Sequence, residues 1–209
     1  MKRIAQFLSI CLNVSFVMLL AGSISVFAQG KDRANEIKSD IATLYARDPL
    51  AQSFCFRDGN YGRVFQDGAT RNRCSDIDFS GYKPDNFCVG VEGGRQGIIV
   101  DLGTPDNLQQ KYGYEETVGK GQGFASIRVR DGKVFVLHEL RSQKLQELRE
   151  TALLFQAPST SLSSVPVRLG HIYLMRLTDS NDQGFELIVK LLVIAHTPDE
   201  SVTIRWQVL

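Results

Sequence analysis

The sequence predicts an α+β fold, mainly antiparallel β in a sandwich-like or meander sheet, with an N-terminal helix and one further helix. Three observations support this fold class: short alternating segments separated by Asp-Gly or Gly-Gly pairs, two stretches with apolar residues at helical spacing, and a long apolar run near the C-terminus. Asp-Gly and Gly-Gly favour hairpins because both central residues of a type I′ turn have positive φ. Several such turns in one stretch indicate an antiparallel sheet.

The chain begins with a typical export signal. Lys2 and Arg3 precede an uncharged stretch, Ile4 to Phe27, and small or apolar residues end it at Ala28. This layout predicts a signal peptide over residues 1–28 and a single exported β-rich domain over 29–209, periplasmic or secreted. The alternative is an uncleaved anchor, because the stretch is long enough to span a bilayer. Its scattered polar residues weigh against that alternative.

The charge balance bears on the partners of the mature domain. The whole chain has 24 basic and 23 acidic residues, and removal of Lys2 and Arg3 leaves 22 basic ones and a formal charge of −1. A nucleic-acid-binding surface needs clustered positive charge, so we expect no nucleic-acid partner. A membrane is expected as a partner only if the leader is uncleaved.

Two helices are predicted from apolar periodicity. The first covers Asp32 to Ala46, with Asp32 as N-cap and Pro49 beyond its end. Its apolar stripe consists of Ala34, Ile37, Ile41, Leu44 and Tyr45. The second runs from about Gln143 to Leu154, capped by Ser142. We expect any subdomain boundary in the polar loop 156–164.

The remaining apolar segments are predicted strands. They are Phe54–Phe56, Tyr61–Phe65, Phe87–Val91, Gly97–Val100, Phe124–Val129, Lys133–Leu137, Val165–Leu177, Phe185–His196 and Val202–Val208. Hairpin turns are expected at Asp58-Gly59, Gly93-Gly94 and Asp131-Gly132. The almost continuous apolar run Leu187 to Ile194 predicts a central strand that is covered on both faces.

Three cysteines would survive cleavage: Cys55, Cys74 and Cys88. An odd number in an oxidising compartment indicates one disulfide and one free thiol. Their spacing does not choose among the three pairings. Zinc ligands usually include a pair two to four residues apart, which these cysteines do not provide.

The segment Asp101-Leu102-Gly103-Thr104 follows a predicted strand and resembles the first phosphate-binding loop of actin-like and sugar-kinase ATPases. The resemblance implies that backbone amides and a hydroxyl would meet nucleotide phosphates. It covers about eight residues, and the mature chain is about half as long as that two-lobed fold requires. Export also separates the chain from ATP. We therefore expect a strand end with a glycine turn, and no nucleotide partner.

Other motifs give no cofactor or metal. The glycine-rich loop Gly119–Gly123 lacks the order of a phosphate-binding loop, although its amides could hold an anion or a sugar hydroxyl. His138-Glu139 begins a zincin motif that fails at Ser142. A site formed by His138, His171 and His196 has no support from spacing. The polar residues of 179–184 are better explained as a hairpin turn than as a calcium loop. We expect no cofactor and no metal.

The segment Arg71 to Phe79 is the predicted functional edge, because it concentrates charge beside Cys74. Asp76 and Asp78 are two residues apart and would share one face of a strand, where Arg71 and Arg73 could neutralise them as a surface ion-pair network. The complete set of candidate residues is Arg71, Arg73, Asp76, Asp78, Gln122 and His138.

Three functions remain open from the sequence. The leading hypothesis is a non-enzymatic binding or envelope-associated module, since no nucleophile motif is present. The second is a hydrolase of cell-wall or extracellular polymer that uses Asp76, Asp78 or His138 as acid or base. The third is a structural or assembly partner that acts through an exposed sheet edge.

Overall fold

The computed structural model describes a defined part of the chain. The described residues are 38–62, 66–67, 70–71, 75–90, 95–113, 124, 126–139 and 141–209. The predicted signal peptide, residues 1–28, lies outside them, as do Arg73, Cys74 and Gln122. All the described residues belong to one unit, Ile37–Leu209.

The largest sheet is a five-stranded antiparallel sheet with the order β1-β15-β14-β13-β8. Its strands are β1 (Ser39–Tyr45), β8 (Arg95–Gly103), β13 (Ile172–Asp179), β14 (Asp182–Thr197) and β15 (Ser201–Val208). The predicted central strand is confirmed: β14 lies between β13 and β15. Its run is buried from Leu187 to Leu191, whereas Ile194, at the end of the predicted run, is 43% exposed. Polar turns join the last three strands, as the sequence predicted.

A second five-stranded sheet has the order β12-β7-β6-β2-β3. Its strands are β2 (Ser53–Cys55), β3 (Asn60–Gly62), β6 (Ile77–Phe79), β7 (Asn86–Val89) and β12 (Ser164–Pro166). The hairpin predicted around Asp58-Gly59 is confirmed by β2 and β3. The hairpin predicted around Gly93-Gly94 is wrong, because β7 pairs with β6 and β12 whereas β8 pairs with β13. The segments that form β7 and β8 are both apolar enough to enter either sheet. The Gly93-Gly94 pair between them therefore could not decide which strands they would pair with.

A third layer contains β9 (Ile127–Arg130), β10 (Lys133–Glu139) and β11 (Lys144–Glu147), in the order β11-β10-β9, with helix α2 (Pro105–Tyr112). The predicted Asp131-Gly132 turn is confirmed, since both residues have positive φ, 50° and 67°. The 3₁₀ helices η1 (Arg149–Phe155) and η2 (Thr160–Leu162) follow β11. The short pair β4 (Gln66–Asp67) and β5 (Thr70–Arg71) forms a separate two-stranded sheet.

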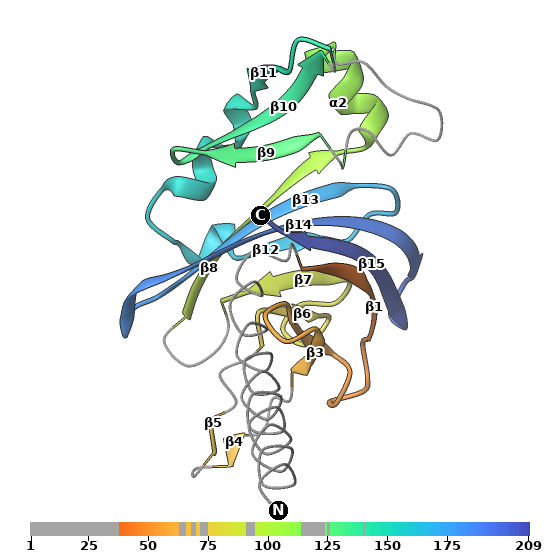
Figure 1. Ribbon diagram of the computed structural model, residues 1–209. Coiled ribbons are helices and arrows are strands. Elements are labelled where there is room, and N and C mark those ends of the chain that lie inside the picture. Colours follow the sequence, from red (N-terminus) through yellow and green to blue (C-terminus); the bar gives the residue numbers. More distant parts are fainter. Residues whose placement is uncertain are drawn as a thin grey trace, which may run out of the picture. The chain divides into compact units, whose positions relative to one another are not determined.

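The large sheet separates two hydrophobic cores. Tyr173, Met175 and Leu177 of β13 belong to the core shared with β2, β6 and β7, whereas Ile172 and Leu174 belong to the core shared with α2, β9, β10 and η1. Figure 1 shows β9, β10 and β11 on one side of the large sheet and β6, β7 and β12 on the other. Because neighbouring residues of a strand face opposite sides, a sheet covered on both faces requires apolar residues at both the odd and the even positions of its strands.

The predicted helix over Asp32 to Ala46 is wrong where it can be compared, because Ser39–Tyr45 forms β1. Residues 32–37 lie outside the described residues. Ala42 and Leu44 are buried, while Ile41 and Tyr45 are exposed, so the burial has the period of a strand. Pairing with β15 overrides the helical spacing of the apolar residues.

The second predicted helix, Gln143 to Leu154, is divided between β11 and η1. Gln143 has a φ of 55°, in the left-handed region, which a right-handed helix excludes. The third layer does contain an α-helix, but it is α2 (Pro105–Tyr112), which the sequence analysis missed. Among the described residues, no helix is long and apolar enough to cross a membrane.

Candidate functional site

The two aspartates of the predicted edge are buried, and this corrects the expected surface ion-pair network. Asp76 is completely buried, forms an ion pair with Arg95, and accepts a hydrogen bond from the backbone N–H of Phe56 at 2.9 Å. Burial raises the pKa of Asp76, and the Arg95 guanidinium opposes this shift. The ring of Phe185 covers Arg95, with its centroid 4.4 Å from the guanidinium carbon. Arg95 is therefore a neutralising partner that the sequence analysis did not consider.

Asp78 stabilises a turn. Its carboxylate accepts hydrogen bonds from the backbone N–H groups of Gly81, at 2.8 Å, and Tyr82. A Cβ on Gly81 would lie 2.6 Å from both carboxylate oxygens, so a side chain at position 81 would displace the Asp78 carboxylate. Burial raises the pKa of Asp78 to about 6, against the two hydrogen bonds that lower it. The arrangement is that of a buried structural carboxyl group.

The other predicted candidates are not brought together with these aspartates by the described contacts. His138 lies on β10, in the third layer, and its Nδ1 is 3.1 Å from the carbonyl oxygen of Tyr112. Arg71 lies in β5, and Arg73 and Gln122 lie outside the described residues. The cysteines are placed in part: Cys88 has a free, buried thiol and Cys55 is disulfide-bonded, while Cys74 lies outside the described residues.

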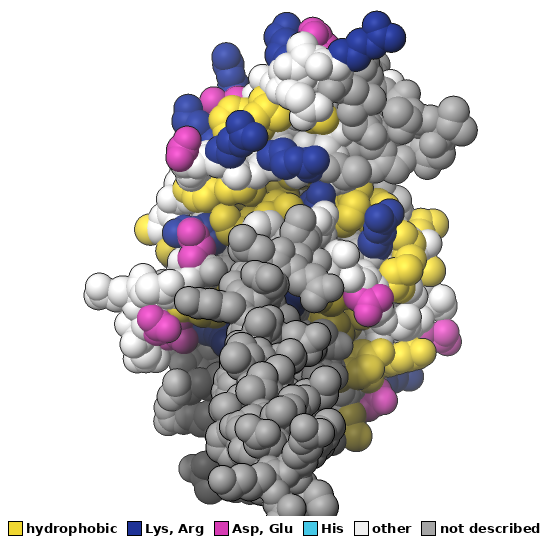
Figure 2. Space-filling model, in the orientation of Figure 1, with side chains coloured by type: hydrophobic (Ala, Val, Ile, Leu, Met, Phe, Trp, Pro, Cys, Tyr) yellow, Lys and Arg dark blue, Asp and Glu magenta, His cyan; other side chains and the backbone are white. Residues whose placement is uncertain are grey.

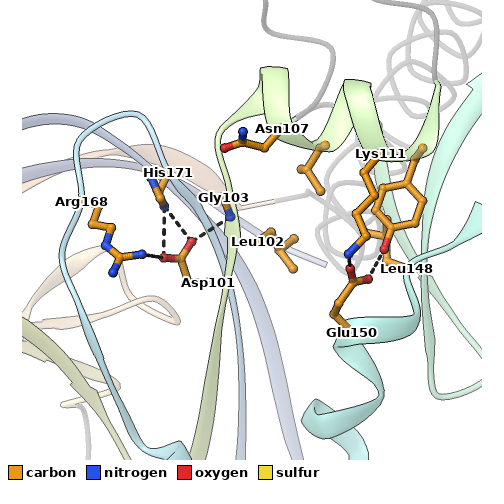
Figure 3. Close-up of a pocket in the computed structure, with 11 residues that line it drawn as sticks. Asp101, Leu102, Gly103, Asn107, Lys111, Leu148, Glu150, Arg168 and His171 are labelled. Carbon is orange, nitrogen blue, oxygen red and sulfur yellow. Dashed lines mark hydrogen bonds and ion pairs between the residues drawn. The ribbon is translucent and has the colours of Figure 1, made fainter.

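A cavity of about 450 Å³ lies where β8, α2, the start of η1 and the loop before β13 meet. A small-molecule site typically occupies roughly 300–1,000 Å³, so the volume suits such a ligand. Its walls are contributed by β8 (Asp101, Leu102, Gly103), α2 (Asn107, Leu108, Lys111, Tyr112), the η1 region (Leu148, Glu150) and the loop before β13 (Arg168, His171). Figure 3 shows these side chains around the cavity.

The local sequence explains how β8 turns into α2 at the cavity. Gly103 has a φ of 81°, and a Cβ there would lie 3.2 Å from the Asn107 Oδ1. Thr104 then caps the helix: its Oγ1 accepts from the Asn107 backbone N–H at 3.2 Å, and its own N–H donates to the Asn107 Oδ1 at 3.1 Å. Pro105 at the first helical position and Gly113 at the end complete a strong pair of helix signals. The expected strand end with a glycine turn is confirmed.

Asp101 organises one side of the cavity. The Nδ1 of His171 is 2.9 and 3.0 Å from the two carboxylate oxygens, and the Gly103 backbone N–H donates to Oδ1 at 2.8 Å. Arg168 approaches Oδ2 with one guanidinium nitrogen at 3.4 Å. Because a carboxylate only accepts, Nδ1 of His171 carries the proton and Nε2 is an acceptor while the ring is neutral.

The hydroxyl group of Tyr173 holds the loop that carries Arg168 and His171. The buried Tyr173 hydroxyl accepts a hydrogen bond from the Arg168 backbone N–H at 2.9 Å and donates to the carbonyl oxygen of Pro166 at 3.0 Å. Burial, followed by the nearby Asp101 charge, raises the pKa of Tyr173, so the hydroxyl keeps its proton. This buried tyrosine fixes the loop backbone while leaving the Arg168 side chain at the surface.

Glu150 organises the opposite side. One carboxylate oxygen forms an ion pair with Lys111, and the other accepts a hydrogen bond from the Tyr112 hydroxyl. Figure 3 shows the Glu150–Lys111 pair on the far side of Leu102 from the Asp101 network. Leu108 and Leu148 are buried, and together with Leu102 they give the cavity an apolar floor. The site thus has an apolar centre between two charged side-chain networks.

The lining supplies a base without a serine or cysteine beside it among the described residues. The paired Asp101 and His171 form an oriented imidazole, which is the arrangement of a general base. Among the described lining residues there is no serine or cysteine that this base could activate. Among the described residues no group of three or more His, Cys, Asp or Glu side chains could hold a metal ion. His138, His171 and His196 instead each contact a different partner.

The third layer carries exposed basic side chains. Figure 2 shows Lys and Arg side chains at the end of the molecule that carries β9–β11, with acidic side chains among them. Lys133 lies 3.2 Å from Glu147, and Lys144 lies 3.5 Å from Glu139. The surface is therefore one of mixed charge, unlike the single-sign stripe of a nucleic-acid interface.

Most of the cavity residues were missed from the sequence. The sequence analysis singled out Asp101, Leu102 and Gly103 only as part of a phosphate-loop resemblance, and His171 only as one of three histidines considered for a metal site. The cap signal Thr104-Pro105 could have predicted α2 and thereby Asn107 and Lys111. No local signal could have joined Asp101 to His171, because they are 70 residues apart in sequence.

In comparisons with known proteins, no family model, no curated protein and no solved structure matches this chain.

Proposed function

We propose that this protein is an exported, non-enzymatic binding module that takes up a small molecule in the cavity between β8, α2, η1 and the loop before β13. One observation carries the proposal: an apolar floor of leucines lies between two charged networks in a cavity of about 450 Å³. Ligand sites are generally apolar cavities with a few placed polar groups. The exported location rests on the predicted signal peptide.

The test is to fill the cavity. A Leu102→Trp variant would place an indole over the floor, whereas Leu169→Trp adds the same ring to an exposed loop leucine that does not line the cavity. We would screen a chemically mixed fragment library against the mature protein by ligand-observed NMR. Fragments that bind wild type and Leu169→Trp but not folded Leu102→Trp support the proposal. Equal binding to all three proteins, or no binding fragment at all, contradicts it.

A second candidate function is a hydrolase of cell-wall or extracellular polymer, and the Asp101–His171 pair favours it. In this version His171 Nε2 would remove a proton from an attacking water molecule. Asp76 and Asp78, which the sequence suggested for this role, are held by internal partners. The test measures product release from purified peptidoglycan and polysaccharides. His171→Asn should abolish any activity, whereas His196→Asn, which alters a second His–Asp pair, should preserve it.

Assembly through the edge of the large sheet has less support. Three outward-facing backbone groups of β1 already have internal partners. The Ile41 N–H donates to Asp40 Oδ1 at 2.8 Å, the Thr43 carbonyl accepts from the Tyr61 hydroxyl at 3.0 Å, and the Tyr45 N–H donates to the Ala51 carbonyl at 3.0 Å. Such contacts compete with the addition of a further strand.

A further inference from the structure

The carboxylates of the cavity are already occupied by internal donors. Asp101 accepts hydrogen bonds from His171 and from the Gly103 backbone, and Arg168 lies beside it. Both oxygens of Glu150 are taken, one by Lys111 and one by Tyr112. A carboxylate oxygen has two lone pairs, so a ligand cation could still approach either carboxylate, but it would then lie beside Arg168 at Asp101 or beside Lys111 at Glu150.

The amide oxygen of Asn107 is occupied as well. It accepts hydrogen bonds from the backbone N–H of Thr104, at 3.1 Å, and from the Thr104 hydroxyl, at 2.8 Å. These bonds form part of the cap of α2, so a ligand that competed for them would also weaken the start of the helix. The acceptor capacity that remains in the described lining is that of Nε2 of His171, while the ring is neutral, of the Tyr112 hydroxyl oxygen, and of the second lone pairs of the carboxylate oxygens.

The donors of the cavity keep free capacity. The Arg168 guanidinium has five N–H groups, but its one described side-chain contact is the long 3.4 Å approach to Asp101, and its side chain is 60% exposed. The Lys111 ammonium has three N–H groups, and its side chain is also 60% exposed beside its single carboxylate partner. The described contacts of Asn107 leave its amide nitrogen available. Hydrogen-bonding capacity in the cavity is thus mainly that of a donor.

The apolar floor adds a second requirement. Leu108 and Leu148 are almost completely buried, and Leu102 lies between the two charged networks. Because Leu108 and Leu148 are already buried, the gain comes from the ligand: an apolar chain or ring that leaves water for this floor gains roughly 25 cal/mol per Å² of its own surface buried, which a fully polar anion does not. The floor therefore selects a ligand with an apolar body.

We propose that the ligand of this cavity is an organic oxyanion, with a carboxylate or phosphate headgroup at Arg168 and an apolar body over the leucine floor. This inference rests on the proposed binding function. An arginine fork can hold either oxyanion with two parallel hydrogen bonds. A cationic ligand of the same shape would meet Arg168 and Lys111, while each cavity carboxylate already pairs with one of these two cations, which discriminates against such a ligand.

The experiment compares four probes with apolar chains of nearly equal length: octanoate, octyl phosphate, octanol and octylamine, each below its micelle concentration or, for octanol, below its solubility limit. Titration calorimetry with the full mature protein should give the tightest binding for octanoate or octyl phosphate. Octanol should bind about tenfold more weakly, because a charge-assisted hydrogen bond is lost, and octylamine should be weaker still. The tighter of the two anions identifies the headgroup.

Variants locate the headgroup. Arg168→Gln should weaken the better anion about tenfold and leave octanol unchanged, because the loop backbone is held by Tyr173 and not by the arginine side chain. Arg130→Gln, at an exposed arginine of β9 outside the cavity lining, is the matched control and should change neither. If Arg168→Gln proves unstable, the salt dependence of octanoate binding, compared with that of octanol binding, shows whether a charged headgroup contact contributes.

The outcomes separate this inference from the proposed function. Octanol or octylamine binding as tightly as the anions, or anion binding that Arg168→Gln leaves unchanged, would overturn the ligand class while the cavity remained a binding site. Failure of all four probes together with the mixed fragment library would overturn both.

Discussion

Asp101 and His171 are 70 residues apart in sequence, yet His171 Nδ1 lies 2.9 Å from Asp101 Oδ1. The pair joins the end of β8 to the loop before β13, and both side chains are 19% exposed. The contact therefore connects the start of α2 to the loop that carries Arg168. It makes one wall of the cavity a single hydrogen-bonded unit.

The first prediction concerns this unit. Asp101→Asn should lower the free energy of unfolding by about 1–3 kcal/mol, because partly buried donors lose a charged acceptor. The double variant with His171→Asn should lose less than the two single variants combined, since the residues share one interaction. Urea unfolding measures both effects. Glu200→Gln, at an exposed glutamate, is the control, and an equal effect of Asp101→Asn and Glu200→Gln would refute the prediction.

The second prediction concerns Lys190, which is buried in the central strand. Its Nζ donates to the Phe124 carbonyl oxygen at 2.7 Å and lies 4.6 Å from the centroid of the Phe124 ring. Burial, and then the charges of Arg128 and Arg205, lower the pKa of Lys190 from 10.5 to about 7. The ammonium group is thus destabilised in the folded protein, although it keeps a hydrogen bond and a ring contact.

The lowered pKa of Lys190 makes the free energy of unfolding depend on pH. Between pH 7 and 10.5 the unfolded chain binds more protons at this site than the folded chain, so the free energy of unfolding rises with pH. The slope is at most about 1.4 kcal/mol per pH unit. Lys190→Met should remove this contribution, whereas Lys133→Met at an exposed site should keep it. Parallel pH profiles of the two variants in urea unfolding would contradict the assignment.

The third prediction concerns Asp78. Its folded pKa of about 6 lies above its ordinary value of 3.8, so the folded chain binds more protons between these pH values. The contribution of Asp78 to the free energy of unfolding therefore falls as the pH rises from 3.8 to 6, and it falls no further above pH 6. The free energy of unfolding of Asp78→Asn, relative to that of wild type, should therefore rise by on the order of 2–3 kcal/mol from pH 4 to pH 7.5. Thermal unfolding of both proteins at these two pH values measures this change. A difference between variant and wild type that is the same at both pH values would contradict the prediction.

The fourth prediction concerns the thiols. Cys88 is free and Cys55 is disulfide-bonded, so Cys74 is the partner expected for Cys55 in the mature protein. Denatured, non-reduced mature protein should contain one titratable thiol. Cys88→Ala should leave none, and Cys74→Ala should leave two. Three thiols in the wild-type protein prepared from an oxidising compartment would rule out the disulfide.

The fifth prediction concerns the edge of β1. Removal of two groups that occupy its backbone, in an Asp40→Ala and Tyr61→Phe double variant, should increase self-association, because the freed groups can pair with another strand. Tyr45→Phe, at an exposed tyrosine of the same strand, is the control. Sedimentation velocity over a concentration series measures the effect. Unchanged self-association in the double variant would show that these contacts do not protect the edge.

The sequence predicted structure best where the signal was local. The Asp58-Gly59 and Asp131-Gly132 hairpins formed as expected, because two adjacent residues decide whether a tight turn can close. The central strand was also correct, since a long apolar run has few alternatives to burial on both faces.

Prediction failed where a distant partner determined the local structure. The apolar residues of Ser39–Tyr45 fit a helix or a strand, and pairing with β15, more than 150 residues away, selected the strand. Asp76 stands near Arg71 and Arg73 in the sequence, but its ion pair is with Arg95. Side chains that are close along the chain need not be close in the fold once the strand that carries them enters a sheet.

The sequence by itself determined that the chain would form an antiparallel β-rich fold with particular hairpins, because these depend on alternating hydrophobicity and on the backbone freedom of glycine. Only the tertiary structure decided the candidate site. Asp101, Lys111, Glu150 and His171 come from different elements, and their convergence depends on which strands pair and which core each element joins. Those choices depend on the packing of the whole sheet, which no short segment of sequence contains.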